Sequence, residues 1–245
     1  MPVSKQIAKF IKSLQNKKHR NETKHFLVEG EKSIKELLAS DFDIQNLLLT
    51  EQACELLNIS FDKANVVSLR ELSSLTSLKT NSFGIAVVKM KEKVLKPPSG
   101  WDIVIEGIND PGNLGTIIRI ADWYNINQII LSENSVDNYN PKVIMSSMGS
   151  FLRVDVFYCQ LLDFLRNDHR DIYFADLNGH SVHDVNFPAN GILVLGSESH
   201  GISQTIKKLH GTTVTIPGRG AAESLNVAVS AAIISDNIFR TIPEN

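Results

Sequence analysis

The stretch Ile216-Pro-Gly-Arg-Gly-Ala-Ala-Glu-Ser-Leu-Asn-Val227 decides the fold of this chain, together with Asn113-Leu-Gly-Thr-Ile-Ile-Arg119 and Leu193-Val-Leu-Gly-Ser-Glu-Ser-His-Gly201. In each stretch, glycines and polar side chains stand where an apolar run meets a helical pattern. Open α/β sheets bind ligands at such junctions, because backbone donors are unpaired there and side chains converge. Three such junctions therefore predict one assembled site.

Residues 101–245 show a repeated strand-and-helix pattern around these junctions. The run 102–108 is apolar without alternation, which is typical of a strand buried on both faces. The alternation predicts an α/β fold with a mostly parallel sheet and helices on both faces. Further strands are predicted at 128–132, 154–158, 172–175, 192–195 and 214–216, and helices at 113–124, 141–149, 160–167, 203–210 and 225–240.

The N-terminal part has its own alternating pattern. It begins with apolar residues at helical spacing between Ile7 and Leu14, which predict an amphipathic helix. The stretch Lys91-Glu-Lys-Val-Leu-Lys-Pro-Pro-Ser-Gly100 then breaks the pattern with charges, two prolines and a glycine. We expect a small α/β domain at 1–92, a linker at 93–100 and a second domain at 101–245. In the first domain, strands are predicted at 26–29, 44–50, 66–69 and 85–90, and helices at 31–39, 51–57 and 71–78.

The net charge of −2 is unevenly distributed along the chain. Residues 1–100 carry 16 Lys and Arg against 11 Asp and Glu, whereas residues 101–245 carry 9 against 16. A basic arm on an otherwise acidic protein favours contact with a polyanion, although a solvated helix face has the same composition. The candidate polyanion-binding residues of this arm are Lys5, Lys9, Lys12, Lys17, Lys18 and Arg20.

Composition restricts the class and the location of the protein. Hydrophobic residues make up 42% and charged residues 21%, as in ordinary globular proteins. The start has no apolar segment like that of a signal peptide, and no apolar run approaches membrane-spanning length. Cys54 and Cys159 belong to no CxxC motif, which fits structural thiols in a reducing cytoplasm. We therefore expect a cytoplasmic protein with no membrane partner.

The first junction joins a turn to the start of a helix. Pro111 and Gly112 favour the turn, and Asn113 is well suited to cap the helix. Arg119 lies nearly two turns further on, so we expect it near the same face as Asn113. A dinucleotide-binding turn is an alternative, because Glu133 ends the second strand. However, the glycines of this region are spaced G-x4-G-x2-G rather than G-x-G-x2-G.

The second and third junctions contribute a carboxylate and an amide. In the second, an apolar strand enters Gly196-Ser-Glu198, where glycine permits a ligand to approach the backbone closely. A carboxylate at a strand end needs a partner or a functional role. In the third, Ser224 and Asn226 offer donors and acceptors within one helical turn after Ile216 and Pro217 end a strand. A helix cap explains one of these two polar groups but not both.

In this order the three stretches resemble the SpoU (TrmH-like) family of RNA ribose 2′-O-methyltransferases, which belongs to the SPOUT superfamily. The family pattern is N-x-G-x-x-x-R, an apolar strand with G-x-E-x-x-G, then I-P and S-L-N-V-x-x-S, the last present as Ser224-Leu-Asn-Val-Ala-Val-Ser230. The resemblance covers residues 101–242. Residues 1–100 are more loosely similar to the small substrate-binding domain often joined to this family, most visibly at Phe26-Leu-Val-Glu-Gly-Glu-Lys32. Tyr124-Asn125 and Ser197 depart from common family residues without removing an expected catalytic group.

The resemblance implies a methyltransferase domain with a C-terminal trefoil knot, whose loops bind S-adenosyl-methionine. It also implies a homodimer formed through this domain, in which Arg119 acts within its own subunit or across the boundary. Ribosomal or transfer RNA would bind the N-terminal domain and its basic arm. The implied cofactor-binding residues are Leu195, Gly196, Ile216, Pro217, Leu225 and Asn226. The implied catalytic residues are Arg119, Asn113, Glu198, Ser224 and Asn226.

The mechanism implied is methyl transfer to a ribose 2′-hydroxyl. Because a sulfonium methyl group is already electrophilic, the protein must mainly align the ribose oxygen and exclude water. A guanidinium is a poor base, so we expect Arg119 to bind a phosphate beside the target. Glu198 would fix Arg119 or Asn113, while Ser224 and Asn226 order the loop and the nucleotide.

Two other functions fit parts of the sequence. An RNA-binding assembly factor that keeps the fold without turnover is the main alternative, and a nucleotide-dependent oxidoreductase is a more distant one. A cofactor-binding assay separates these classes. His180, His183 and Asp184 are too few for a metal site, so no metal is expected. His200 is interpreted as a residue that shapes the loop beside Glu198.

Overall fold

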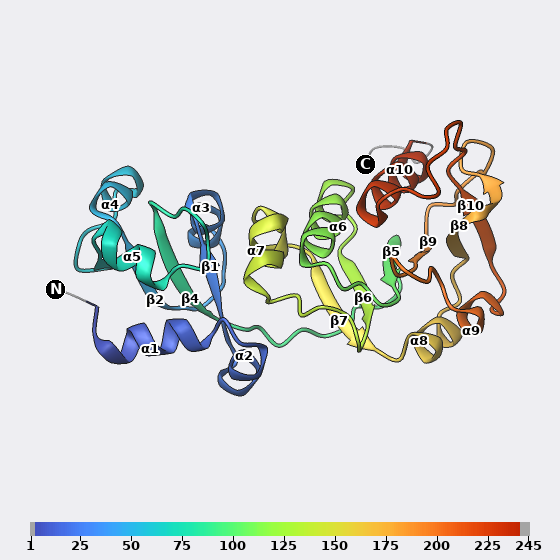
Figure 1. The fold of residues 1–245 in the computed structure, drawn as a ribbon. Helices are drawn as coiled ribbons and strands as arrows, with labels where there is room; N and C mark the ends of the chain where they lie inside the picture. Colours follow the sequence, from blue (N-terminus) through green and yellow to red (C-terminus); the bar gives the residue numbers. More distant parts are fainter. Residues whose placement is uncertain (1–2, 241–245) are drawn as a thin grey trace. The chain divides into compact units, whose positions relative to one another are not determined.

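The structure is a computed structural model that describes residues 3–240. The chain forms two compact units, coloured from blue to red along the sequence in Figure 1. The first unit contains the chain up to Glu92 together with Asp137–Leu152, and the second contains Lys93–Val136 and the chain from Arg153 onward. The expected second domain, 101–245, therefore contributes one internal segment to the first unit.

The first unit has a four-stranded mixed sheet in the order β1-β4-β2-β3. Strands β1 and β2 are antiparallel to β4, and β3 is parallel to β2. The strands are β1 His25–Glu29, β2 Ile44–Leu49, β3 Asn65–Val66 and β4 Gly84–Lys89. The helices are α1 Lys5–Ser13, α2 Lys17–Thr23, α3 Glu31–Leu38, α4 Glu51–Leu57, α5 Leu69–Leu75, α7 Pro141–Ser147 and the 3-10 helix η1 Ser150–Leu152.

Local capping explains where several of these elements differ from the prediction. The expected strand 66–69 is shorter because Ser68 caps α5 in a capping box with Glu71. Helix α2 was not predicted; Asn16 caps it, and Lys24 ends it in the left-handed region at φ 59°. A short, highly charged helix of this kind has no apolar periodicity to reveal it.

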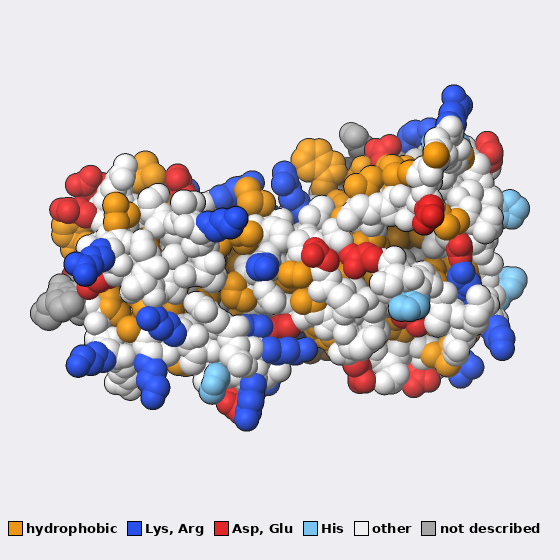
Figure 2. Space-filling view, viewed as in Figure 1, with side chains coloured by type: hydrophobic (Ala, Val, Ile, Leu, Met, Phe, Trp, Pro, Cys, Tyr) orange, Lys and Arg blue, Asp and Glu red, His pale blue; other side chains and the backbone are white. Residues whose placement is uncertain are grey.

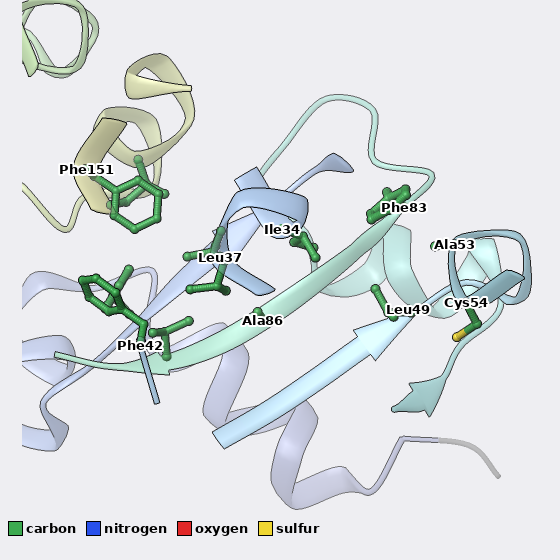
Figure 3. Close-up of a cluster of buried hydrophobic side chains, with 13 residues drawn as sticks. Ile34, Leu37, Phe42, Leu49, Ala53, Cys54, Phe83, Ala86 and Phe151 are labelled. Atoms are coloured by element: carbon green, nitrogen blue, oxygen red, sulfur yellow. The ribbon is translucent and has the colours of Figure 1, made fainter. Parts of the chain in front are cut away.

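Two hydrophobic clusters fill the first unit, and one of them includes the segment 137–152. Phe151 of η1 lies edge-on to Phe42 with ring centroids 6.3 Å apart, and both are buried (Figure 3). Tyr139 packs on Phe26 at 4.5 Å between centroids. These contacts explain why the segment belongs to this unit, because its aromatic rings complete a core that residues 3–92 leave open.

Arg20 fastens the same segment by charge. Its side chain donates through Nε to Asp137 at 3.0 Å and through Nη1 to the carbonyl oxygens of Leu14 and Gln15 at 2.8 and 2.9 Å. Arg20 is only 1% exposed. The expectation that Arg20 binds a polyanion was therefore wrong: its guanidinium is buried and already hydrogen-bonded within the protein.

The second unit has a six-stranded sheet in the order β10-β8-β9-β5-β6-β7. All neighbouring strands are parallel, as predicted, and both central strands, β5 and β9, are buried along their whole length. The strands are β5 Trp101–Ile105, β6 Gln128–Ser132, β7 Asp155–Cys159, β8 Ile172–Ser181, β9 Gly191–Leu195 and β10 Thr212–Thr215. The helices are α6 Pro111–Trp123, α8 Leu161–Asn167, α9 Gln204–Lys207 and α10 Val227–Phe239.

Two elements of this unit differ from the prediction. Strand β8 continues beyond the expected 172–175, because after a bulge Val214 and Thr215 of β10 pair with His180 and Ser181. Helix α9 is shorter than the expected 203–210 and starts after its cap, Ser203. Within residues 3–240 no helix is both long and apolar enough to cross a bilayer.

The strand order locates the ligand-binding edge of this sheet. From β5 the chain adds β6 and β7 on one side, and later places β9 and β8 on the other. The order reverses between β5 and β9, and ligands bind beyond the carboxyl ends of strands at such a point. The loops that follow β5, β9 and β10 contain the three stretches singled out in the sequence.

Candidate active site

A cavity of about 1330 Å³ opens at this edge of the second-unit sheet. Its walls come from the start of α6, from residues 195–201 after β9, from residues 214–227 around the end of β10, and from residues 175–177 of β8. Small-molecule sites usually occupy roughly 300–1,000 Å³. The cavity therefore has room for a cofactor and for part of a second molecule.

Most of the predicted site residues meet in this cavity. Arg119 is absent from its lining in the described chain. The predicted cofactor-binding residues that line it are Leu195, Gly196, Ile216, Pro217, Leu225 and Asn226. The predicted catalytic residues that line it are Asn113, Glu198, Ser224 and Asn226.

Three of these residues, one from each of the three junctions, form a hydrogen-bond relay: Asn226, Asn113 and Glu198. The backbone amides of Ala228 and Val229 donate to Asn226 Oδ1 at 2.9 and 3.4 Å, so this oxygen caps α10. Asn226 Nδ2 then donates to Asn113 Oδ1 at 3.0 Å, and Asn113 Nδ2 donates to Glu198 Oε1. Because the helix fixes the amide of Asn226, the relay has one direction and ends on a carboxylate acceptor.

Helix α6 is capped by a different residue from the one expected. Asp110 Oδ1 accepts a hydrogen bond from the backbone amide of Asn113 at 2.9 Å, and the helix begins at Pro111. The expectation that Asn113 caps this helix was wrong, because Asn113 already lies in the first turn. Its side chain is consequently free to join the relay.

Arg119 lies on another face of α6 than Asn113. Six residues at 3.6 residues per turn place two side chains about 120° apart around the helix axis. The expectation of a shared face was therefore wrong. The side chain of Arg119 is exposed, and it makes no hydrogen bond or ion pair with any other residue of the described chain.

The turn after β9 requires glycine at its first position. The backbone groups of Ser197 and Gly201 pair, with hydrogen bonds of 3.1 and 2.9 Å, and close a tight turn. A Cβ on Gly196 would overlap the Gly201 carbonyl group and the Ile202 amide. Glycine is therefore needed for space, and the turn holds Glu198 exposed at the cavity.

The cavity has an acidic lining, part of which the sequence did not reveal. The lining has four carboxylates and two cationic side chains: Asp110, Asp176, Glu198 and Glu223 against Lys207 and Arg219. Lys207 forms an ion pair with Asp176. Burial by itself would raise the pKa of Asp176, but the hydrogen bond and charge of Lys207, together with hydrogen bonds from the backbone amides of Leu177 and Asn178, hold that pKa below its usual value. Asp176 directly follows the predicted strand 172–175, but it belongs to none of the motifs that the sequence singled out.

Two histidines of the second unit, His183 and His200, make hydrogen bonds within the protein. His183 Nδ1 lies 3.2 Å from Asn237 Oδ1 of α10. Within residues 3–240 no group of three or more His, Cys, Asp or Glu side chains is arranged to hold a metal ion. The backbone amide of His200 donates to Ser197 Oγ at 3.1 Å, so His200 takes part in the turn after β9.

The remaining candidate polyanion-binding residues lie on the first unit. Lys and Arg side chains gather over α1 and α2, at the lower left of Figure 2. Lys18 is within 3.9 Å of Glu22, a weak contact between exposed side chains. The exposed lysines of these helices are Lys5, Lys9, Lys12, Lys17 and Lys18.

Comparison with known proteins shows to which class of protein this fold and cavity belong. The model of the SpoU rRNA methylase family matches residues 101–236, and that of the MRM3-like substrate binding domain matches residues 5–97. The protein is therefore an RNA methyltransferase. It belongs to the SpoU rRNA methylase family, whose model covers more than half of the chain. Both resemblances noted in the sequence are confirmed.

Individual relatives agree with this assignment. The 23S rRNA (guanosine(2553)-2′-O)-methyltransferase RlmP of Bacillus subtilis is 30% identical over 91% of this chain and 92% of its own length. A TrmH-family protein of Porphyromonas gingivalis is 30% identical, with a TM-score of 0.84 over 98% of this chain and 99% of that one. The SpoU methyltransferase AviRb of Streptomyces viridochromogenes, solved with AdoMet, is 25% identical, with a TM-score of 0.84 over 97% and 98% of the two chains.

The residues present fit S-adenosyl-methionine, the cofactor of this chain. The donor carries positive charge on its sulfonium and ammonium groups, and the lining has more carboxylates than cations. Residues of the turn after β9, including Gly196, line the cavity at the carboxyl edge of the sheet. Leu195, Ile216 and Leu225 supply apolar surface to the same lining.

Proposed function

We propose that this chain methylates the 2′-hydroxyl of a ribose in 23S ribosomal RNA, with S-adenosyl-methionine as donor. The proposal rests on the hydrogen-bond relay. Its residues Asn226, Asn113 and Glu198 come from three separate junctions and are hydrogen-bonded to one another at the wall of one cavity. Support for the acceptor comes from the similarity to RlmP, which is named for guanosine 2′-O-methylation of 23S rRNA. The chain spans nearly the whole length of that relative.

The residues of the relay position the acceptor nucleotide. Bound S-adenosyl-methionine supplies a methyl group that is already electrophilic. Glu198 Oε1 accepts from Asn113, and its second oxygen has no partner among the described residues, so it can accept a hydrogen bond from the ribose hydroxyl and take up its proton as the methyl group is transferred. Asn113 and Asn226 hold that carboxylate in place, and Ser224 borders the cavity beside them. Correct positioning of this kind lowers the activation free energy of methyl transfer by several kcal/mol.

The knot and the cofactor contacts remain part of this proposal. We expect residues 195–201 and 214–227 to be the knot loops, because they line the same cavity from the carboxyl ends of β9 and β10. The backbone near Leu195, Gly196 and Ile216 would hold the donor. Unpaired thiols at Cys54 and Cys159, together with an RNA substrate, support the cytoplasmic location expected from the sequence.

We further propose that two copies pair through α6 and α10. These helices pack on each other and carry exposed apolar side chains, with Trp123 82% and Val229 46% exposed. Figure 2 shows hydrophobic side chains gathered over both helices. Arg119 lies on α6 outside the cavity of its own chain, which suits a role at the partner's cavity. There its guanidinium would bind a phosphate next to the target ribose.

The acceptor is tested by mapping ribose methylation in total RNA from cells with and without the protein. We expect one 23S rRNA position to lose its 2′-O-methyl group when the gene is removed. Purified protein with labelled S-adenosyl-methionine should restore the mark on that RNA. An unchanged ribose map, or S-adenosyl-methionine binding without transfer to any RNA, would favour a non-catalytic assembly factor.

The pairing is tested by complementation between inactive variants. Arg119→Ala and Asn113→Ala proteins are expected to be inactive when each is alone. If Arg119 acts on the partner, random mixing of the two gives mixed dimers with one intact site, and about a quarter of wild-type activity returns. No recovery in a verified mixed dimer would place Arg119 in its own subunit's reaction.

A further inference from the structure

We propose that Arg219 binds an RNA phosphate beside the target nucleotide, carried there by a rearrangement of the loop 217–225. The inference rests on the proposed function in one respect, since it takes RNA as the substrate. It concerns a residue of the stretch 216–227 that the family pattern leaves unspecified, and a conformation other than the one observed.

The loop 217–225 has little that holds it in its present conformation. Every residue from 217 to 226 is exposed, and none of the residues 217–226 lies in a helix or strand. Residues 217–225 make no hydrogen bond to another residue of the described chain. Solvated backbone of this kind opens and rearranges at small cost. Both ends are fixed, by β10 before the loop and by the Asn226 cap after it.

The glycines that flank Arg219 are not required by the observed conformation. Gly218 and Gly220 are not among the glycines with positive φ. No heavy atom lies within 4 Å of the position that a Cβ would occupy at either residue. An alanine would therefore fit both positions as the loop now stands, unlike Gly196. Two glycines with no present requirement indicate a second conformation, in which the backbone takes up positive φ or approaches a ligand closely.

The charges around the cavity indicate which ligand Arg219 would bind in that second conformation. Among the described residues that line the cavity, Arg219 is the cation without an ion pair, because Lys207 is bound to Asp176. The four carboxylates of the lining suit a cationic cofactor but repel an RNA backbone. A guanidinium at the rim offsets that repulsion and can donate two parallel hydrogen bonds to one phosphate. The cavity also has room beyond a cofactor for part of a nucleotide.

Arg219→Ala in the full-length protein tests the interaction directly. We expect the affinity for 23S rRNA fragments to fall about tenfold, and the slope of log affinity against log salt to decrease by roughly 0.7–0.9, the value for one phosphate. The affinity for S-adenosyl-methionine alone, measured by calorimetry, should stay within twofold of wild type. Arg219→Lys should keep the salt slope while recovering only part of the affinity.

A matched control removes an equivalent charge elsewhere on the same unit. Arg166 is exposed on α8 and does not line the cavity. Arg166→Ala should leave both the RNA affinity and the salt slope unchanged. If Arg219→Ala matches this control, the proposal is overturned. If it weakens S-adenosyl-methionine binding tenfold with an unchanged salt slope, Arg219 holds the cofactor's carboxylate and the proposal is equally overturned.

The rearrangement has its own test in the double variant Gly218→Ala/Gly220→Ala. Because alanine fits the observed loop, the melting temperature should be unchanged or slightly raised. We expect kcat/KM for RNA to fall about tenfold while S-adenosyl-methionine affinity stays near wild type. Full activity in the double variant would show that no second conformation is needed. A wild-type protein that binds RNA with the expected salt slope but methylates none would refute the proposed function and leave the Arg219 interaction in place.

Discussion

Asn226 determines the direction of the hydrogen bonds in the relay. Its Oδ1 is occupied by two backbone amides of α10, so only its Nδ2 can face Asn113. Asn113 must then accept with its oxygen and donate with its nitrogen to Glu198. A helix cap thus fixes Asn113 as a hydrogen-bond donor to Glu198.

Replacement of Asn113 tests this directionality. Asn113→Ala leaves Glu198 and Asn226 without their shared partner, and we expect kcat to fall about 100-fold with little change in stability. Asn113→Asp still accepts from Asn226 but places a second carboxylate against Glu198, so it should be at least as inactive. Methyl incorporation under saturating cofactor and RNA gives both values. Wild-type turnover in Asn113→Asp would show that donation to Glu198 is not required.

Gly196→Ala tests the turn that presents Glu198. The added Cβ would overlap backbone atoms of Gly201 and Ile202, which cannot move without opening the turn. We expect a loss of about 1–3 kcal/mol in the free energy of unfolding, together with weaker cofactor binding. Gly218→Ala is the matched control, because its Cβ meets no atom within 4 Å. Equal melting temperatures for the two variants would contradict this account.

For single residues, the sequence identified most of those at the site but not the hydrogen bonds between them. The motifs brought out Asn113, Glu198 and Asn226, and all three line the cavity. They could not show which residue caps α6, since Asp110 and Asn113 are both good caps. Asp176 lines the cavity as well and directly follows the predicted strand 172–175, but no motif singled it out.

Among the elements, the linker is more firmly held than its composition indicates. Lys93 and Lys96 both bind the carboxylate of Asp155, at the start of β7, with N–O distances of 3.0 Å. Burial by itself would raise the pKa of Asp155, but the hydrogen bonds and charges of the two lysines outweigh it and lower that pKa. Prolines and charges predicted a loop correctly, whereas its attachment depends on a residue about sixty positions away in the sequence.

Asp155→Asn should therefore show a pH-dependent loss of stability. A carboxyl group with a lowered folded-state pKa stabilises the protein above its unfolded pKa of about 3.9, and this contribution is lost as pH falls through the folded value. At pH 7 we expect the variant to lose about 1 kcal/mol, since the side chains are partly exposed. Denaturant titrations at pH 7 and at pH 3 measure the difference, which should shrink at the lower pH. A constant difference across this range would assign the effect to packing.

Strands and helices with apolar periodicity were predicted closely, and those governed by caps or bulges were not. Strand β6 has the predicted bounds, 128–132, and α4 has the predicted 51–57. Strand β3 ends early because Ser68 caps α5, and α9 starts one residue later than expected because Ser203 caps it. Capping depends on one side chain, so periodicity alone places such ends poorly.

At the level of the whole molecule, the uneven charge predicted a basic surface near the N-terminus. In the structure the exposed lysines of that surface lie on α1 and α2, which are part of the folded first unit. Ile11 and Leu14 of the first helical region are fully buried, so the N-terminal region is no loose arm. Arg20 belongs to the interior, and the exposed lysines remain the candidates for RNA binding. Deletion of the region would consequently remove core residues along with charge.

Neutralisation in place is the better test of this surface. Changing Lys5, Lys9, Lys12, Lys17 and Lys18 to Gln should keep the fold and lower RNA affinity, with the salt slope reduced by roughly 0.7–0.9 for each phosphate that the variant no longer binds. Lys63→Gln/Arg70→Gln, which changes exposed cations near β3, serves as the control. An unchanged salt slope in the five-lysine variant would show that these helices do not bind RNA.

The segment 137–152 has a consequence for how this protein can be divided. Because the polypeptide leaves the second unit at Val136 and re-enters it at Arg153, neither unit is a continuous stretch of gene. A fragment ending at Glu92 would lack the carboxylate that neutralises Arg20 and the ring that faces Phe42. An exchange of the N-terminal module at the linker alone would therefore separate Arg20 and Phe42 from their partners in the segment 137–152, unless that segment were exchanged with it.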